Sequence, residues 1–253
     1  MGKVNAKKID LNLLRHTCKY CGQEKKLIDA HIIPEAFFRP LLNEKDPPQL
    51  MTNIGGIFPK RVRKGIYDKT ILCRECEDNF APWDDYAQSL LLQRLKDARA
   101  LRHGGEIAGL AFPNYDYTKL KLFFISVLWR ASVSTQRFYE KIQLGPFEPH
   151  AKELIERKDP GLPDDFSVTL AHFEEKIGMV PLDPYREKYF GINFCRFYLG
   201  GYVALIKTDK RPSPSQIGDL ALGKSDKLYI ISRRFFQSPE LNIAKQILKK
   251  AKH

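Results

Sequence analysis

The sequence lacks both a long apolar run and a secretion signal. Its most apolar segment, residues 120–133, contains Lys121 and Arg130 and is shorter than the about 20 apolar residues that a membrane-spanning helix needs. The basic residues near the N-terminus are not followed by the apolar stretch of a signal peptide. These absences lead us to expect a cytoplasmic protein with no membrane partner.

Acidic residues are few for the number of basic ones. The 253 residues include 30 Asp and Glu against 42 Lys and Arg, which gives a formal net charge of +12. Such an excess raises the local concentration of polyanions and favours nucleic acid as a partner. The alternative is that the charge serves solubility alone.

Cysteine is also scarce, and four of the five cysteines form two Cys-x-x-Cys pairs, which we call knuckles. In a chain without a secretion signal, such pairs are better explained by metal than by disulfides. Four thiolates in two pairs are the usual closed ligand set of structural zinc. The alternative is two unrelated redox or buried pairs, because residues 22–72 form a longer spacer than compact zinc ribbons use. The predicted zinc ligands are Cys18, Cys21, Cys73 and Cys76.

A single histidine, His31, lies between the knuckles. Residues 27–33 are predicted to be a strand that ends at Pro34, which cannot donate to a ladder. Residues 66–72 are predicted to be the returning strand, and residues 73–76 to open a short helix. A lone histidine beside apolar residues is most often an ordinary core or surface residue, so only its position between the knuckles marks His31.

The order of these pieces resembles a known family. A knuckle, a strand with x-His-Ile-x-Pro, a returning strand and a Leu-Cys-x-x-Cys helix are similar to the HNH (ββα-metal, treble-clef) endonucleases over residues 18 to 85. The His-Ile-Ile-Pro and Gly-Ile-Tyr-Asp stretches resemble bacterial members with a long C-terminal part, several of which act in defence against foreign DNA. The resemblance implies a metal-dependent endonuclease that hydrolyses phosphodiester bonds of DNA.

The resemblance also assigns roles to three residues. His31 would be the general base that deprotonates the attacking water. Asp68 matches the middle asparagine of the family, which braces the loop. Glu77 matches a metal-binding position on the helix, where a carboxylate suits a hard cation such as Mg²⁺ or Mn²⁺.

One residue departs from the family pattern. Ala30 stands where the commonest pattern of the family has a metal-binding acid. The alternative is therefore that this chain has lost the active site. Asp29 would point to the opposite face of a regular strand and could bind the catalytic ion only through a bulge. Asp84 and Asp85 are further candidates, although acids at the start of a helix are also explained by its dipole.

A basic run follows a long connection of residues 43–65, and a loop of this length is usually functional or disordered. Its side chains are predicted to contact phosphates, and a solvated charge run is an equal alternative. The candidates are Lys60, Arg61, Arg63 and Lys64.

The fold we expect is α+β in two parts. Residues 1–104 would form the zinc-stapled ββα-metal module with a trailing helix over 83–102, and residues 105–253 an accessory domain of unknown role. The second part is predicted to have helices over 118–141 and 149–157, a final helix opened by residues 238–240, and a small antiparallel sheet. Its predicted strands are residues 166–170, 189–198, 202–207 and 227–232.

Several alternatives stay open from the sequence. The chain is either a nuclease, a non-catalytic zinc-containing adaptor that binds nucleic acid, or an RNase or toxin-like effector. No motif decides whether the accessory domain forms a homodimer or binds a partner protein of a defence system. Cys195 is predicted to be a buried apolar side chain. The remaining histidines lack partner spacing and are predicted to be bystanders: His16, His103, His150, His172 and His253.

Overall fold

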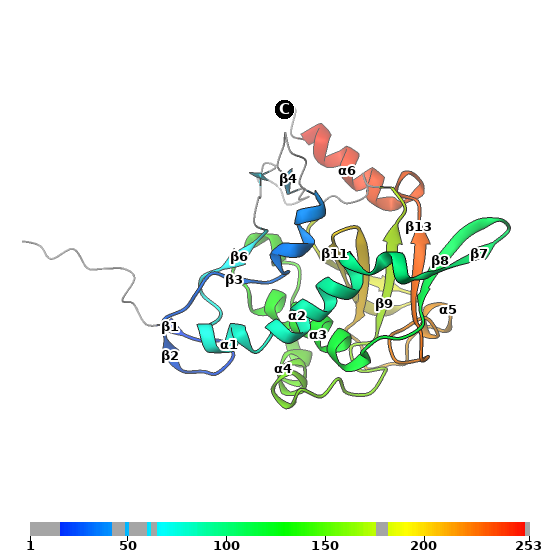
Figure 1. The fold of residues 1–253 in the computed structure, drawn as a ribbon. Helices are drawn as coiled ribbons and strands as arrows, with labels where there is room; N and C mark the ends of the chain where they lie inside the picture. Colours follow the sequence, from blue (N-terminus) through cyan, green and yellow to red (C-terminus); the bar gives the residue numbers. More distant parts are fainter. Residues whose placement is uncertain (1–15, 42–48, 51–59, 62–64, 176–181, 251–253) are drawn as a thin grey trace, which may run out of the picture.

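A seven-stranded sheet forms the largest part of the molecule (Figure 1). The computed structural model describes residues 16–41, 49–50, 60–61, 65–175 and 182–250. The strand order is β10-β11-β12-β9-β13-β8-β7, and all neighbours are antiparallel except β9 and β13. The strands are β7 Arg99–His103, β8 Glu106–Phe112, β9 Val168–Phe173, β10 Tyr185–Tyr189, β11 Ile192–Leu199, β12 Tyr202–Lys207 and β13 Leu228–Arg233.

The two faces of this sheet are covered by different helices. Leu170 and Ala204 belong to the large core that contains α3 (Tyr117–Val133). Ala171 and Val203, their neighbours in the strands, belong to a second cluster with α6 (Pro239–Lys250). Successive strand residues point to opposite faces, so α3 and α6 lie on opposite sides of the sheet. The mixed α+β fold class is thereby confirmed.

Helix α3 is the centre of the large core. Asp116 caps its N-terminus by accepting a hydrogen bond from the Lys119 backbone N–H. Every residue from Leu120 to Ala131 is buried, as its nearly continuous apolar sequence predicts. It packs against α2 (Ala81–Gln88) and α4 (Glu148–Arg157). Ser134 is extended, so the helix ends before the expected residue 141.

The segment with the cysteines contains short elements. Strand β3 (Ala30–His31) pairs antiparallel with β6 (Tyr67–Asp68), and helix α1 (Arg74–Asp78) follows. The predicted strands over 27–33 and 66–72 therefore exist but are shorter. Two more pairs are β1 (His16–Thr17) with β2 (Glu24–Lys25), and β4 (Gln49–Leu50) with β5 (Lys60–Arg61). Two 3₁₀ turns, Glu35–Phe37 and Arg39–Leu41, follow Pro34.

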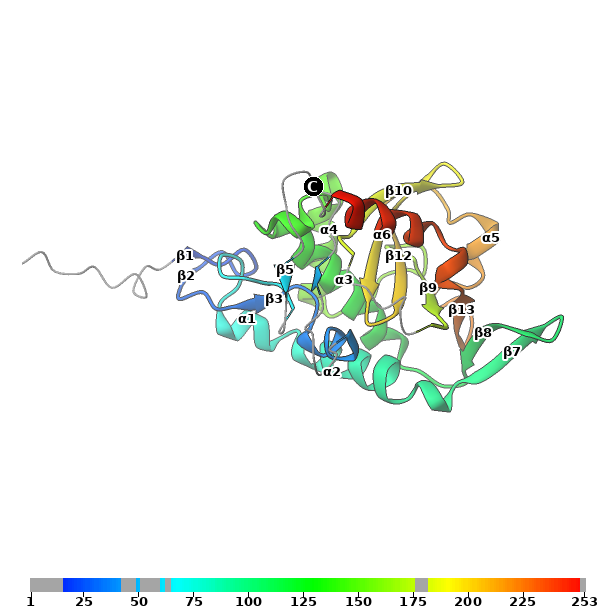
Figure 2. The same cartoon turned by 90° about the horizontal axis from the view of Figure 1, so that it is seen from above.

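The helix predicted over residues 83–102 is wrong in its second half. Helix α2 passes into a π turn, Ser89–Gln93, and a 3₁₀ turn, Leu95–Asp97, before β7 begins. Gly104 and Gly105 have φ values of 57° and 85° and form the turn between β7 and β8. The boundary expected near residue 104 therefore lies inside a hairpin, which projects from the sheet on the side away from β1 and β2 (Figures 1 and 2).

The later helices and strands mostly lie where predicted, but the expected small antiparallel sheet is wrong, because the sheet has seven strands and β9 and β13 are parallel. Helix α4 has proline in its first turn, and β11 and β12 form the hairpin around residues 200–201. Strand β13 and helix α6 lie where expected. The strand predicted over 189–198 is broken by Phe190 and Gly191, which have positive φ and separate β10 from β11. Among the described residues, no helix is long and apolar enough to cross a membrane.

Candidate functional site

The two knuckles come together in space. The sulfur atoms of Cys18, Cys21, Cys73 and Cys76 all lie within 4.8 Å of one another. Sulfurs arranged tetrahedrally around zinc at 2.3 Å would be separated by about 3.8 Å. The four free thiols therefore form a group that could hold a metal ion such as zinc.

Backbone N–H groups around the cluster favour the thiolate of Cys18, whereas burial raises the pKa of Cys73 and of Cys76. Gly22 adopts a left-handed φ of 70°, and its N–H donates to the Cys18 carbonyl at 2.9 Å. The Cys73 N–H donates to Cys18 Sγ at 3.4 Å. Burial opposes ionisation of Cys18, but N–H donors from Cys21, Cys73 and Tyr20 outweigh it and lower its pKa to about 7.

Helix α1 places Glu77 against the strand that carries His31. Because Cys76 is part of the cluster, the next residue on α1 is held beside β3. The backbone N–H of His31 donates to Glu77 Oε1 at 3.3 Å. Glu77 Oε2 is buried and has no hydrogen-bond partner among the residues that the structure describes. Burial raises the pKa of Glu77, and the positive charge of Arg130 opposes that rise.

Arg130 is a site residue that sequence reasoning missed. It is fully buried on α3, and its Nη1 donates to the carbonyl oxygen of His31 at 2.9 Å. Its guanidinium also binds the Asp84 carboxylate through two bonds of 3.1 and 2.8 Å. The guanidinium lies 4.9 Å from the Phe80 ring centroid. An arginine on a helix that is apolar all round was the available signal, because a buried charge needs a partner.

Asp68 is a structural brace for β6. Its Oδ1 accepts hydrogen bonds from the Thr70 N–H and hydroxyl at 2.8 and 2.7 Å. Its Oδ2 accepts from the Ser134 hydroxyl at 2.9 Å and from the Thr135 N–H and hydroxyl. Burial alone would raise the pKa of this carboxyl, but the donors prevail and lower it. Asp68 thus ties β6 to the end of α3.

The other predicted acids are not brought to His31 in the same way. Asp29 is exposed and forms an ion pair of 3.7 Å with Lys69. Asp84 is the partner of Arg130, and Asp85 is exposed. Among the described residues, the four cysteines are the only set of three or more His, Cys, Asp or Glu side chains this compact.

The basic run is only partly visible. Lys60 and Arg61 form β5, whereas Arg63 and Lys64 lie outside the described residues. Cys195 is buried on β11, as expected. Among the bystander histidines, His16 is exposed on β1, His150 stacks on Phe166, and His253 lies outside the described part of the chain.

Comparison of the sequence with protein-family models, and of the chain with curated proteins and solved structures, gave no match in any of the three. The resemblance to HNH endonucleases therefore rests on the residues themselves. What the structure adds is the four-cysteine cluster and the contacts that surround His31 and Glu77.

Proposed function

We propose that the chain is a metal-dependent endonuclease that hydrolyses phosphodiester bonds of DNA, with cleavage of foreign DNA as its role. One observation carries the proposal. Glu77 binds the backbone of His31 with one carboxylate oxygen, and its other oxygen is buried without a hydrogen-bond partner in the described part of the chain. An orphaned carboxylate oxygen beside a histidine fits a site for a hard divalent cation and a general base.

The residues would divide the chemistry as follows. Glu77 Oε2 would hold Mg²⁺ or Mn²⁺, and the ion when bound would stabilise negative charge on the phosphate and the leaving oxygen. The His31 imidazole would accept the proton of the attacking water. Asp84 is a secondary ligand candidate, because both of its oxygens already accept hydrogen bonds from Arg130. Arg130 and Asp68 act as positioning residues that fix β3 and β6.

Binding of the substrate would depend on the positive charge. The formal charge of +12 favours a polyanion, and the run from Lys60 to Lys64 supplies several candidate phosphate contacts close in sequence to β6. Zinc held by the cysteines would take no part in the hydrolysis itself. Its role would be to hold α1, and with it Glu77, against β3.

Nicking of supercoiled plasmid in Mg²⁺ or Mn²⁺ tests the proposal. We expect the His31→Ala variant to lose at least about 100-fold in rate, because general-base catalysis contributes that much. The matched control is His16→Ala, which removes an exposed histidine of the same segment. The proposal fails if the His31 variant cuts as fast as the wild type.

Glu77 is tested with a variant of nearly the same shape. Glu77→Gln keeps an oxygen for the His31 N–H but removes the charge that would bind the cation. We expect weaker Mn²⁺ binding, measured by electron paramagnetic resonance, and loss of nicking with unchanged zinc content. Glu75→Gln, an exposed position of the same helix, is the control. If the wild type binds DNA but cuts neither DNA nor RNA with any divalent ion, the non-catalytic adaptor replaces the nuclease.

A further inference from the structure

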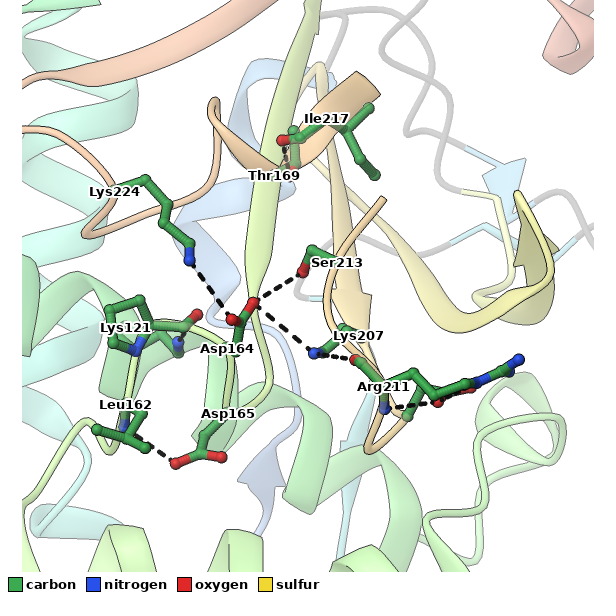
Figure 3. Close-up of polar contacts among 12 residues, drawn as sticks. Lys121, Leu162, Asp164, Asp165, Thr169, Lys207, Arg211, Ser213, Ile217 and Lys224 are labelled. Atoms are coloured by element: carbon green, nitrogen blue, oxygen red, sulfur yellow. Dashed lines mark hydrogen bonds and ion pairs between the residues drawn. The ribbon is translucent and has the colours of Figure 1, made fainter. Parts of the chain in front are cut away.

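Three lysines converge on one end of the seven-stranded sheet, on elements far apart in sequence (Figure 3). Lys207 is the last residue of β12, and Lys224 precedes β13. Since β12 is antiparallel and β13 parallel to β9, both residues lie near the start of β9. Asp164 lies just before β9, and Lys121 comes from the first half of α3.

Asp164 occupies the centre of this group. Lys224 Nζ lies 3.4 Å from its Oδ2, and Lys207 Nζ lies 3.8 Å from its Oδ1. The Ser213 hydroxyl donates to Oδ1 at 3.2 Å. The Asp164 side chain is 44% exposed, whereas that of Lys207 is 2% exposed. The carboxylate lies between the amines of Lys207 and Lys224, and Lys207 Nζ also donates to the Arg211 carbonyl at 2.7 Å (Figure 3).

Lys121 is the least closely paired of the three lysines. It is fully buried, and its nearest hydrogen-bond acceptor is the Pro163 carbonyl, at a long 3.5 Å. Among the described residues, no carboxylate oxygen lies within 4 Å of its Nζ. The amine lies 5.7 Å from the centroid of the Tyr117 ring, whose hydroxyl is buried without a hydrogen-bond partner. Burial of an amine that makes only a long hydrogen bond and a ring contact is costly for the fold, so packing alone explains Lys121 poorly.

We propose that Lys121, Lys207 and Lys224 form a binding site for the phosphate group of a small anionic ligand, in which the phosphate takes the place of the Asp164 carboxylate. Amines converging from three elements suit a compact anion with several acceptor oxygens. A phosphate dianion carries more charge than one carboxylate and would compensate Lys121 as well. Asp165 accepts a hydrogen bond from the Leu162 N–H at 3.0 Å, and its charge also acts on Lys121.

The segment that carries Asp164 is flanked by two residues with a left-handed backbone. It runs between Lys158 and Phe166, which have φ values of 53° and 46°. A left-handed φ is strained for a buried aromatic residue, and such strain often marks a functional segment. Displacement of Asp164 would move this segment away from the lysines.

The site is separate from the proposed nuclease centre. Lys121 and Arg130 lie nine residues apart on α3, which corresponds to about 14 Å along the helix and about half a turn around it. The two residues therefore face opposite sides of the same helix. The proposal does not rest on nuclease activity, and either one can fail alone.

Titration with inorganic phosphate tests the site, with calorimetry at pH 8 in buffers of different ionisation enthalpy. Burial lowers the pKa of Lys121 to about 7, while Asp165 and Asp164 oppose this change and Lys207 and Lys224 add to it. The lysine is therefore mostly neutral at pH 8, and an arriving anion would recharge it. We expect uptake of about one proton per phosphate bound by the wild type.

Two variants make the test specific. Asp164→Asn removes the competing charge and is expected to tighten phosphate binding about tenfold. Lys121→Met replaces a buried amine with an apolar side chain of similar length, and is expected to abolish proton uptake and weaken binding about tenfold. Lys227→Met, an exposed position of the same loop, is the control. The proposal is overturned if neither the wild type nor Asp164→Asn binds phosphate at 10 mM, a concentration on the order of weak anion sites, or if Lys121→Met leaves binding and proton uptake unchanged.

Discussion

Asp68 shows how one carboxylate fixes a strand of only two residues. It is fully buried, and all of its hydrogen bonds come from neutral donors of Thr70, Ser134 and Thr135. We expect Asp68→Asn to lower the free energy of unfolding by about 2–3 kcal/mol, because hydrogen bonds to a charged group are lost and a donor amide faces other donors. Urea denaturation at pH 7 measures this change.

The pH dependence of stability provides a second readout for Asp68. Its pKa is lower in the folded protein than in the unfolded chain, so its contribution is complete above about pH 4. The contribution is lost as the pH falls through the folded pKa. The difference in stability between wild type and Asp68→Asn should therefore shrink in acid. Asp29→Asn, an exposed acid beside the same strands, should show neither effect.

At the scale of elements, α3 connects the two parts that the sequence predicts as separate. Arg130 near its end binds the carbonyl of His31, and the residues after it bind Asp68 on the paired strand. One helix thus holds both strands of the candidate site. The accessory part supplies contacts to the site as well as packing.

A double-mutant cycle tests the Arg130–Asp84 pair. Arg130→Met leaves a partly buried carboxylate without its partner, and we expect it to cost about 3–5 kcal/mol of unfolding free energy. Asp84→Leu alone should be similarly destabilising, since it leaves a buried guanidinium. The double variant should recover at least about 2 kcal/mol relative to the sum of the single changes. If the effects of the two single substitutions on the free energy of unfolding, measured by urea denaturation, simply add up in the double variant, the two side chains do not stabilise each other.

The knuckles give a prediction for metal content. Cys73→Ser removes one of four ligands, so zinc in the freshly purified protein should fall from about one equivalent to below about half. Cys195→Ala is the matched control, because it is the one cysteine outside the cluster. Elemental analysis measures both. Zinc below half an equivalent in the wild type would contradict the assignment.

The sequence predicts those elements whose signals are local. Two Cys-x-x-Cys pairs, Pro149 at the start of α4 and the glycines between β11 and β12 all act over a few residues. The four cysteines come together, and the helix and the hairpin lie where predicted. Strand β7 could not be found in this way. Its residues carry a pattern compatible with a helix, and pairing with β8 decides the outcome.

The site is less predictable than the scaffold because its contacts are long-range. Arg130 and His31 lie 99 positions apart, and Arg130 and Asp84 lie 46 apart. A pattern within one window cannot show that these residues meet. Asp84 by itself has the simpler explanation of an acid in the first turn of a helix. Only the packing of α2 against α3 shows that Asp84 and Arg130 form an ion pair.

At the scale of the whole molecule, one core joins the knuckles to the sheet. Cys18 and Trp83 belong to the same buried cluster as Phe123 and Ile206. We therefore expect substitutions of Arg130 that destabilise the fold to affect both the candidate site and the sheet.

The salt dependence of DNA binding tests where the positive charge of the chain acts. Each phosphate neutralised contributes about −0.9 to the slope of log K against log salt concentration. Replacing the basic run Lys60, Arg61, Arg63 and Lys64 with glutamine should therefore reduce the slope by about 3–4 if all four contact phosphates. Fluorescence anisotropy with a labelled duplex at several salt concentrations measures it. The control replaces four exposed basic residues elsewhere: Arg99, Lys188, Lys210 and Lys227. Equal slope changes in both variants would indicate diffuse attraction by the net charge of +12 instead of a phosphate-contacting segment.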